Sequence, residues 1–223
     1  MYNGLSRKRR FGFTLVEVLV TTVVVGVMAA VVVPAVVKHT TGGDSARVAS
    51  DLGAVKSGID IFAQSVRPRT PGDIEDLVNT ISTSDKGVDG TVYTADNVAN
   101  WKGPYLEWTV AATATDANTV VALKSGGNAI ISSALYRCPQ IATYGTGTTG
   151  DLPCTIYTAE GTANRDSAYT SVRITGIALG GNEFANLNAI IDGAAESSST
   201  DFGLLRQNAA GTVFFLATPY TAP

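Results

Sequence analysis

The longest hydrophobic stretch of the chain runs from Phe13 to Val37, and only three threonines and Glu17 interrupt it as polar residues. As an α-helix these 25 residues would extend roughly 37 Å at about 1.5 Å per residue, enough to cross the ~30 Å hydrocarbon layer of a membrane. Valine is the commonest residue and would favour a strand in water. Within lipid the backbone must satisfy its own hydrogen bonds, so the pattern predicts one membrane-spanning helix.

A second pattern follows between Ser45 and Val66, where apolar residues recur at alternating intervals of four and three. This spacing predicts an amphipathic helix with one stripe for packing on a sheet. We expect Gly42 and Gly43 to weaken the helix before it, and Asp44 or Ser45 to cap its resumption. The segment 67–72 should end it. The stripe consists of Val48, Leu52, Val55, Ile59, Phe62 and Val66.

The remaining pattern alternates between short strands and short helices, which predicts an α+β fold with an antiparallel sheet wrapped on the second half of the long helix. Helices are expected at Asp73–Ile81 and Asn182–Ile191. The segment Ser82–Gly90 should be a polar loop, and Gly203–Arg206 should start a turn. Strands are expected at Glu107–Ala111, Thr119–Leu123, Ala129–Ser132, Ser171–Leu179 and Val213–Leu216.

Charge is distributed unevenly along the chain. The net charge is −3, but four of the 16 basic residues are Arg7, Lys8, Arg9 and Arg10, which leaves 12 basic against 19 acidic residues, or −7, elsewhere. The basic cluster predicts a cytoplasmic N-terminus, and therefore a head on the far side of the membrane. An acidic remainder argues against nucleic acid as a main partner of the head, because phosphate binding needs clustered Lys and Arg.

The two cysteines, Cys138 and Cys154, enclose 15 residues. In a head outside the cytoplasm they are expected to form a disulfide, worth on the order of 3 kcal/mol by the chain-entropy model. Two free buried thiols are the alternative. A structural zinc site would need four ligands, and His39 is the single histidine, so we expect no metal and no cofactor.

Catalytic signatures are missing from the sequence. It has no phosphate-binding Gly-x-x-x-x-Gly-Lys-Ser/Thr loop and no Gly-x-Ser-x-Gly, and its single histidine lies at the expected membrane exit. The adjacent Glu75 and Asp76 should point in different directions and be solvated. Asp85 and Asp89 could bind calcium, but they lack an EF-hand pattern and are more often ordinary loop acids. The aromatic residues Trp101, Tyr105 and Trp108 favour core packing over a binding patch. We therefore expect a non-enzymatic protein.

An unpaired carboxylate is costly in hydrocarbon, so Glu17 needs a partner. A secretory signal peptide would have a shorter, purely apolar core, and a plain anchor would have no use for the acid. A further alternative is that Glu17 only caps the start of the helix.

The sequence Arg10-Phe-Gly-Phe-Thr-Leu-Val-Glu17, with its basic leader and apolar continuation, resembles the start of the type IV pilin superfamily, which includes the type II secretion pseudopilins. The resemblance covers roughly residues 7–40. It implies cleavage between Gly12 and Phe13 by a prepilin peptidase, N-methylation of Phe13, assembly through Glu17 and Phe13, and a helix kink at Pro34. The stretch Trp101–Leu106 resembles the major pseudopilins, although their calcium-binding loop is not recognisable here.

The resemblance also implies an organisation: a cleaved leader at 1–12, a transmembrane and polymerisation helix at 13–37, the amphipathic half of the long helix at 38–66 and an extracytoplasmic head at 67–223. The chain would be a subunit of a type IV pilus-like or type II secretion pseudopilus filament. Expected partners are other pilin-like subunits in homo- or hetero-oligomers, the prepilin peptidase and methyltransferase, and an inner-membrane assembly platform. A membrane-tethered binding or enzymatic domain remains the alternative.

Overall fold

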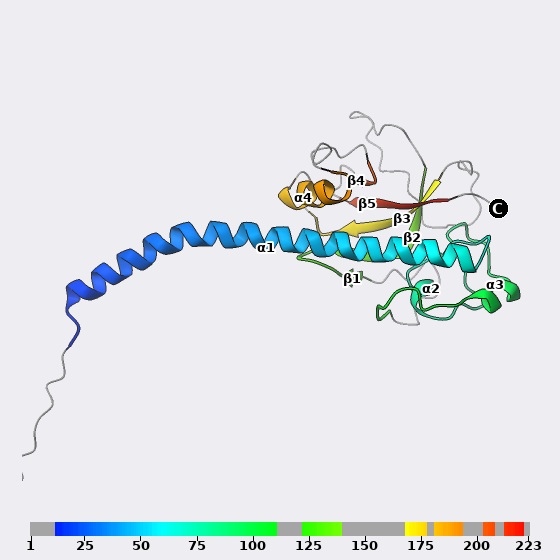
Figure 1. Ribbon diagram of the computed structural model, residues 1–223, viewed down its shortest axis with the longest axis horizontal. Coiled ribbons are helices and arrows are strands. Elements are labelled where there is room, and N and C mark those ends of the chain that lie inside the picture. Colours follow the sequence, from blue (N-terminus) through cyan, green and yellow to red (C-terminus); the bar gives the residue numbers. More distant parts are fainter. Residues whose placement is uncertain are drawn as a thin grey trace, which may run out of the picture. The chain divides into compact units, whose positions relative to one another are not determined.

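The computed structural model describes residues 12–110, 122–139, 168–177, 181–193, 203–207 and 212–220. The chain divides into two compact units, residues 1–40 and 41–223 (Figure 1). A single α-helix, α1 (Leu15–Ser65), contributes residues to both.

The helix α1 joins the two predicted helical segments without a break. Gly42 and Gly43 are both helical, so the expected interruption and the new cap at Asp44 or Ser45 were wrong. Glycine costs about 1 kcal/mol relative to alanine inside a helix, which is small beside the cost of ending one helix and nucleating another. At the other end, α1 begins at Leu15 because Thr14 acts as its N-terminal cap.

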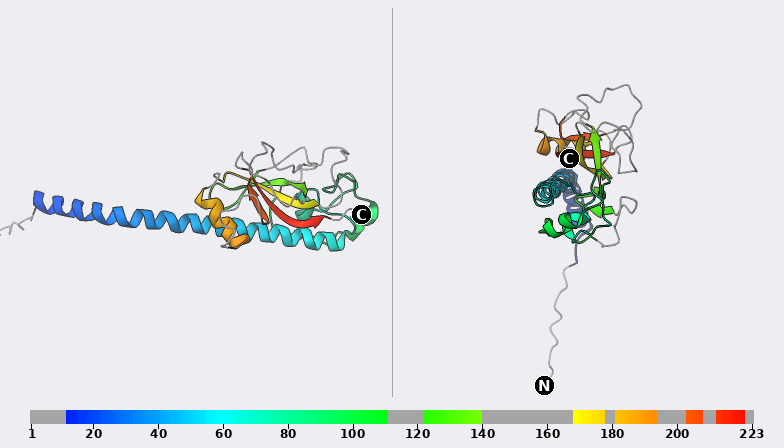
Figure 2. Two further views of the ribbon diagram at one scale, coloured as in Figure 1. Left: turned by 90° about the horizontal axis from the view of Figure 1, so that it is seen from above. Right: turned by 90° about the vertical axis from the view of Figure 1, so that its right-hand side faces the viewer.

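The core of the second unit is built on the predicted stripe of α1. All six stripe residues are buried, with exposed fractions of 0–3%. They join one apolar cluster with residues from the sheet and from α4 (Asn182–Ile191), whose Phe184 and Leu187 face inward. Figure 2 shows the sheet lying along one side of the part of α1 that belongs to this unit. The helix-on-sheet packing predicted from periodicity is confirmed.

The substitution Leu52→Ala should lower the free energy of unfolding of the head by about 2–5 kcal/mol, because Leu52 is fully buried and the smaller side chain leaves a cavity. Denaturant unfolding of the full chain in detergent, followed by tryptophan fluorescence, measures this loss. The matched control is Ile61→Ala on the same helix, where the side chain is 46% exposed and the change should stay within about 0.5 kcal/mol. Equal losses in both variants would contradict the assignment of the buried stripe.

The described strands form one antiparallel sheet in the order β1-β2-β3-β5-β4. Two irregularities in register occur, one in β2 between Ile131 and Leu135 and one in β5, where the partners of the consecutive Thr170 and Ser171 skip from Thr218 to Leu216. The α+β prediction with an antiparallel sheet is confirmed. The strands are β1 (Ala122–Lys124), β2 (Ile130–Pro139), β3 (Ala168–Thr175), β4 (Leu205–Gln207) and β5 (Val213–Tyr220).

Several predicted elements differ in extent. The helix expected at Asp73–Ile81 is only α2 (Glu75–Val78), because Ile74 N–H donates to the carbonyl of Ser133 in β2 (2.8 Å), which ties the preceding residues to the sheet. The described residues 107–110 of the expected strand Glu107–Ala111 are not a strand. The neighbouring Leu106 N–H donates to the carbonyl of Leu77 (3.2 Å), so this segment lies against α2 instead.

Two elements were missed. The turn expected at Gly203–Arg206 leads directly into β4, which pairs with β5 over three residues. The helix α3 (Ala95–Asn100) starts in a capping box in which Thr94 and Asn97 bond reciprocally. Both are too short to give a clear periodicity in the sequence.

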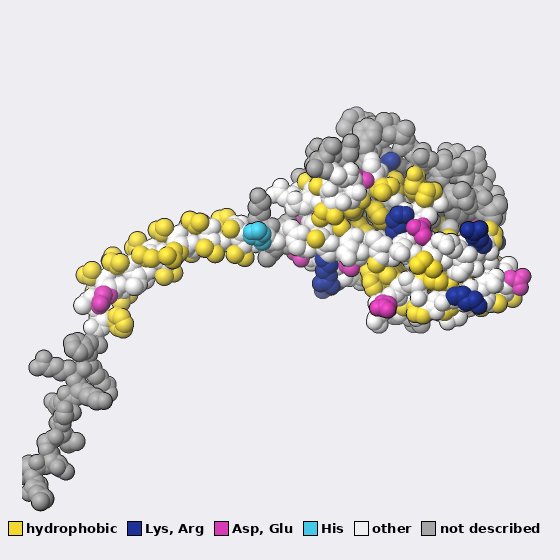
Figure 3. All heavy atoms as spheres, in the orientation of Figure 1, with side chains coloured by type: hydrophobic (Ala, Val, Ile, Leu, Met, Phe, Trp, Pro, Cys, Tyr) yellow, Lys and Arg dark blue, Asp and Glu magenta, His cyan; other side chains and the backbone are white. Residues whose placement is uncertain are grey.

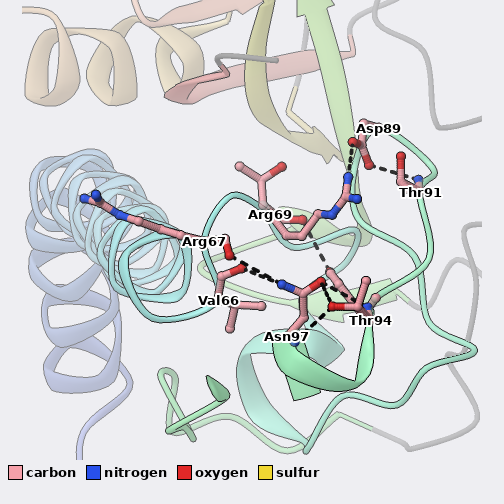
Figure 4. A network of polar contacts seen from close by, with 9 residues as sticks. Val66, Arg67, Arg69, Asp89, Thr91, Thr94 and Asn97 are labelled. Atoms are coloured by element: carbon pink, nitrogen blue, oxygen red, sulfur yellow. Dashed lines mark hydrogen bonds and ion pairs between the residues drawn. The ribbon is translucent and has the colours of Figure 1, made fainter. Parts of the chain in front are cut away.

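The end of α1 is closed by a polar network (Figure 4). The side-chain amide of Asn97 donates to the carbonyl oxygens of Val66 (3.1 Å) and Arg67 (3.4 Å), which satisfies acceptors that a helix end leaves without partners. Beside it Arg69 forms an ion pair with Asp89 (3.1 Å). The segment after α1 is therefore fastened to the helix end by side chains as well as by packing.

Candidate processing and assembly site

Three residues, Gly12, Phe13 and Thr14, precede α1 and are not helical. All three are exposed, and Phe13 is 88% exposed. A Cβ placed on Gly12 would meet no atom within 4 Å in the described part of the chain. The chain's own packing therefore does not require glycine at this position, and a requirement for it has to come from a molecule that approaches the backbone from outside.

The start of α1 is a capping box made by Thr14 and Glu17. The Thr14 hydroxyl accepts from the Glu17 backbone N–H (3.2 Å), while Glu17 Oε2 accepts from the backbone N–H (2.8 Å) and the hydroxyl (2.9 Å) of Thr14. Glu17 therefore does cap the start of α1 in this chain, and a further role of its charge in assembly stays a prediction. Thr14 was missed as a site residue, although Thr-x-x-Glu before an apolar run is a readable signal for such a cap.

Capping leaves acceptor capacity on Glu17. An ionised carboxylate has about four acceptor positions, and Thr14 uses only Oε2. Among the described residues, no ion pair includes Glu17. The carboxylate can thus accept from a second, cationic donor while it keeps its bonds to Thr14.

The helix that carries Glu17 is exposed and apolar. Leu15–Val36, 22 residues with a mean hydropathy of 2.6, is the one segment among the described helices long and apolar enough to cross a membrane, judged by length and composition. Hydrophobic side chains line it in Figure 3. At about 1.5 Å per residue it is roughly 33 Å long, which matches a hydrocarbon layer of ~30 Å.

Other predicted site residues are placed but not tested. Pro34 lies inside α1, and a kink there stays a prediction. His39 is exposed. The disulfide also stays a prediction, since Cys154 and the side chain of Cys138 lie outside the described residues.

One acidic candidate of the head, Asp76, is buried, and its three aromatic candidates pack against the core. Asp76 is buried rather than solvated, because Tyr93 and the backbone of Gly72 supply its hydrogen bonds, so that expectation was wrong. Trp101, Tyr105 and Trp108 pack against the core as expected. No group of three or more metal-ligating side chains occurs in the described ranges.

Comparison with known proteins bears on the N-terminal segment. Residues 7–33 match the model of the prokaryotic N-terminal methylation motif. The chain begins like a prepilin. The matched residues contain the basic cluster, Gly12, Phe13 and Glu17, and the predicted resemblance to pilin-like proteins is confirmed.

Relatives narrow the resemblance further. The chain is 31% identical over 77 residues to the type II secretion system core protein G of Aeromonas hydrophila, and 35% identical over 77 residues to that of Klebsiella pneumoniae. It is 33% identical over 73 residues to that of Vibrio cholerae. These alignments cover 32–34% of this chain, which spans about half the length of the relatives (50–55%). No solved structure matches the chain.

Proposed function

We propose that this chain is a structural, non-enzymatic subunit of a type II secretion pseudopilus. The observation that carries the proposal is the arrangement of one short segment: an exposed Gly12–Phe13 junction, an acid in the first turn of the helix, and an apolar helix long enough for a membrane. The methylation motif over residues 7–33 and the similarity to proteins named core protein G support it.

The proposed sequence of events starts in the membrane. A prepilin peptidase cuts between Gly12 and Phe13 on the cytoplasmic side, and Phe13 is N-methylated. The peptide bond is hydrolysed by water, so Phe13 gains an amine that takes up a proton, and Gly12 leaves with a carboxylate. The apolar helix keeps the subunit in the inner membrane with its head on the extracytoplasmic side, where a disulfide between Cys138 and Cys154 closes one loop of the head.

Assembly then depends on Glu17. In the stored subunit, Thr14 satisfies one oxygen of the carboxylate within the same chain. On entry into the filament, the carboxylate pairs with the ammonium group of Phe13 in an adjoining copy or another pilin-like subunit, which offsets the cost of burying either charge alone. The pairing gives attraction and axial register together. Removal of the subunit from the lipid is the task of an inner-membrane assembly platform.

Two other functions share parts of this arrangement. A pilin for adhesion, motility or DNA uptake would use the same leader, but the relatives' names favour the secretion filament. A tethered binding or enzymatic domain would use the helix only as an anchor and would not need Gly12 or Glu17.

Recovery of the chain in sheared filaments tests the proposal. In cells that contain a prepilin peptidase and a type II secretion machine, overproduced chain should appear in the fraction sheared from the surface, as filaments that antibodies against the head decorate in electron microscopy. The same cells without the assembly platform are the control and should retain the chain in the membrane. A chain that stays in the membrane fraction in both strains would favour the tethered domain.

A further inference from the structure

Two buried carboxyl groups, those of Asp73 and Asp76, lie at the start of α2. Their exposed fractions are 8% and 6%. Their surroundings include Tyr93, whose ring packs against Phe62 of α1 with centroids 6.0 Å apart. The pair therefore lies where the loop after α1 meets the core.

The hydrogen bonds of the pair join several segments. Asp76 Oδ2 accepts from the Tyr93 hydroxyl (2.6 Å) and from the Gly72 backbone N–H (2.8 Å). The Asp76 N–H donates to Asp73 Oδ1 (3.1 Å), and the indole N–H of Trp101 donates to the Asp76 carbonyl (3.0 Å). These bonds hold residues 72–76 to the segments that carry Tyr93 and Trp101.

The charged groups around the pair are mainly acids. The negative charge of Glu75 raises the pKa of Asp73, and the negative charge of Asp85 in the neighbouring loop raises the pKa of Asp76. Each acid thus disfavours a further negative charge on the pair. Arg69 on the same loop forms its ion pair with Asp89 (Figure 4), and Lys86 lies in a backbone bridge with Val92. Ionising both aspartates thus places two negative charges in an apolar, acid-lined site.

We propose that Asp73 and Asp76 form a pH-sensitive latch, which fastens residues 72–76 to Tyr93 and the core in acid and loosens as the pH rises. With one or both carboxyls protonated, the hydrogen bonds that Tyr93 and Gly72 donate to Asp76 are kept, and the two carboxyl groups do not repel each other. With both ionised, the two carboxylates repel each other and the segment separates from the core more readily. The latch responds to the pH of the compartment that surrounds the head, and it does not depend on filament assembly.

The directions of the pKa shifts agree with this geometry. Burial, and next the charge of Asp76, raise the pKa of Asp73 from 3.8 to about 8. Burial raises the pKa of Asp76 from 3.8 to about 7, against hydrogen bonds from Tyr93 and Gly72 that lower it. Burial also raises the pKa of Tyr93 well above 10, so this hydroxyl remains a donor.

The sign of the effect follows from these shifts. Because both carboxyls have a higher pKa in the folded chain than the ordinary 3.8 of an unfolded one, the folded state binds more protons between these values. The stabilisation is complete below about pH 4 and is lost by about pH 8. Over that range the opening equilibrium constant should rise by up to about tenfold per pH unit for each proton released.

The test compares the full chain in detergent at pH 5 and pH 8. The denaturation midpoint is followed by tryptophan fluorescence, because Trp101 is bonded to Asp76 and reports the state of the latch. The second measurement is the protection factor for amide exchange at Gly72, whose N–H donates to Asp76. We expect the midpoint and the protection to be lower at pH 8. In Asp73→Asn, which keeps an oxygen for the Asp76 N–H, the difference between the two pH values should shrink.

The matched control is Glu107→Gln, which neutralises an exposed acid and should keep the pH dependence of the unaltered chain. Asp76→Asn is the second variant and should also reduce it. An unaltered chain with equal midpoints and protection at pH 5 and pH 8 overturns the proposal, whatever the variants do. It is overturned equally if Asp73→Asn and Glu107→Gln show the same pH dependence.

Discussion

Replacing Gly12 with valine is expected to leave the chain as an unprocessed precursor that retains residues 1–12. Nothing in the described chain crowds a side chain at this position, so the variant should fold and insert normally. A β-branched side chain should block the close approach of the peptidase to the backbone at the expected cleavage site. A penalty of only about 1.4 kcal/mol in the cleavage transition state slows the step tenfold. The ratio of precursor to mature chain on an immunoblot measures the effect.

Gly42→Val is the matched control for this experiment. Gly42 also has no atom within 4 Å of an added Cβ, but it lies inside α1 and away from the junction. It should be processed like the unaltered chain. Normal processing of Gly12→Val would place the cleavage elsewhere, and equal defects in both variants would point to poor insertion instead.

Replacing Glu17 with alanine should give a chain that is processed but hardly assembles. Under the proposed function, cleavage depends on the junction at Gly12 and Phe13, whereas assembly depends on the carboxylate, which would neutralise the terminal ammonium of an adjoining copy. Removing one partner of a buried ion pair typically costs about 3–5 kcal/mol, or at least a hundredfold in an equilibrium. The measurement is the amount of chain in the sheared fraction, relative to mature chain in the membrane.

The capping box makes a sharper version of this experiment possible. Glutamine at position 17 can keep the bonds to Thr14 but carries no charge, while Thr14→Val removes the cap and keeps the charge. If Glu17 acts through its charge, Glu17→Gln assembles as poorly as Glu17→Ala. Thr14→Val, which costs the helix start about 0.5–2 kcal/mol, should then assemble better than either. Normal filaments from Glu17→Gln would mean that Glu17 serves only as a cap.

Much of the fold could be predicted from local patterns. The stripe from Val48 to Val66 gave the buried face of α1, and the apolar spacing in Asn182–Ile191 gave α4 with its bounds. In both, the period of the helix determines the pattern, so no knowledge of distant contacts is needed.

Elements that depend on distant partners were harder to predict. Asp76 looks like a surface acid in the sequence, and its burial follows from Tyr93, 17 residues away. The segment after Leu106 has the composition of a strand, but the backbone N–H groups of Tyr105 and Leu106 just before it donate to the carbonyl of Leu77 and hold the chain against α2. Gly42 and Gly43 predicted a break in the helix. The helix α1 continues through them because the helical residues on both sides outweigh the low helix propensity of glycine.

The candidate site could be proposed from the sequence because its residues are close together in the chain. Gly12, Phe13 and Glu17 fall within one short motif, and the methylation motif over residues 7–33 includes all three. Thr14 was missed because the prediction rested on the charge of Glu17, with helix capping by Glu17 only as an alternative. The structure shows the capping bonds between Thr14 and Glu17 directly.

The mass of the N-terminal peptide in filaments purified from native material is the most direct measurement of the central claim, that processing creates the partner of Glu17. A peptide that begins at Phe13 and carries one added methyl group is the expected result. Native chain that still begins at Met1 would have no free amine at Phe13 for an adjoining Glu17, and assembly by this pairing would be contradicted.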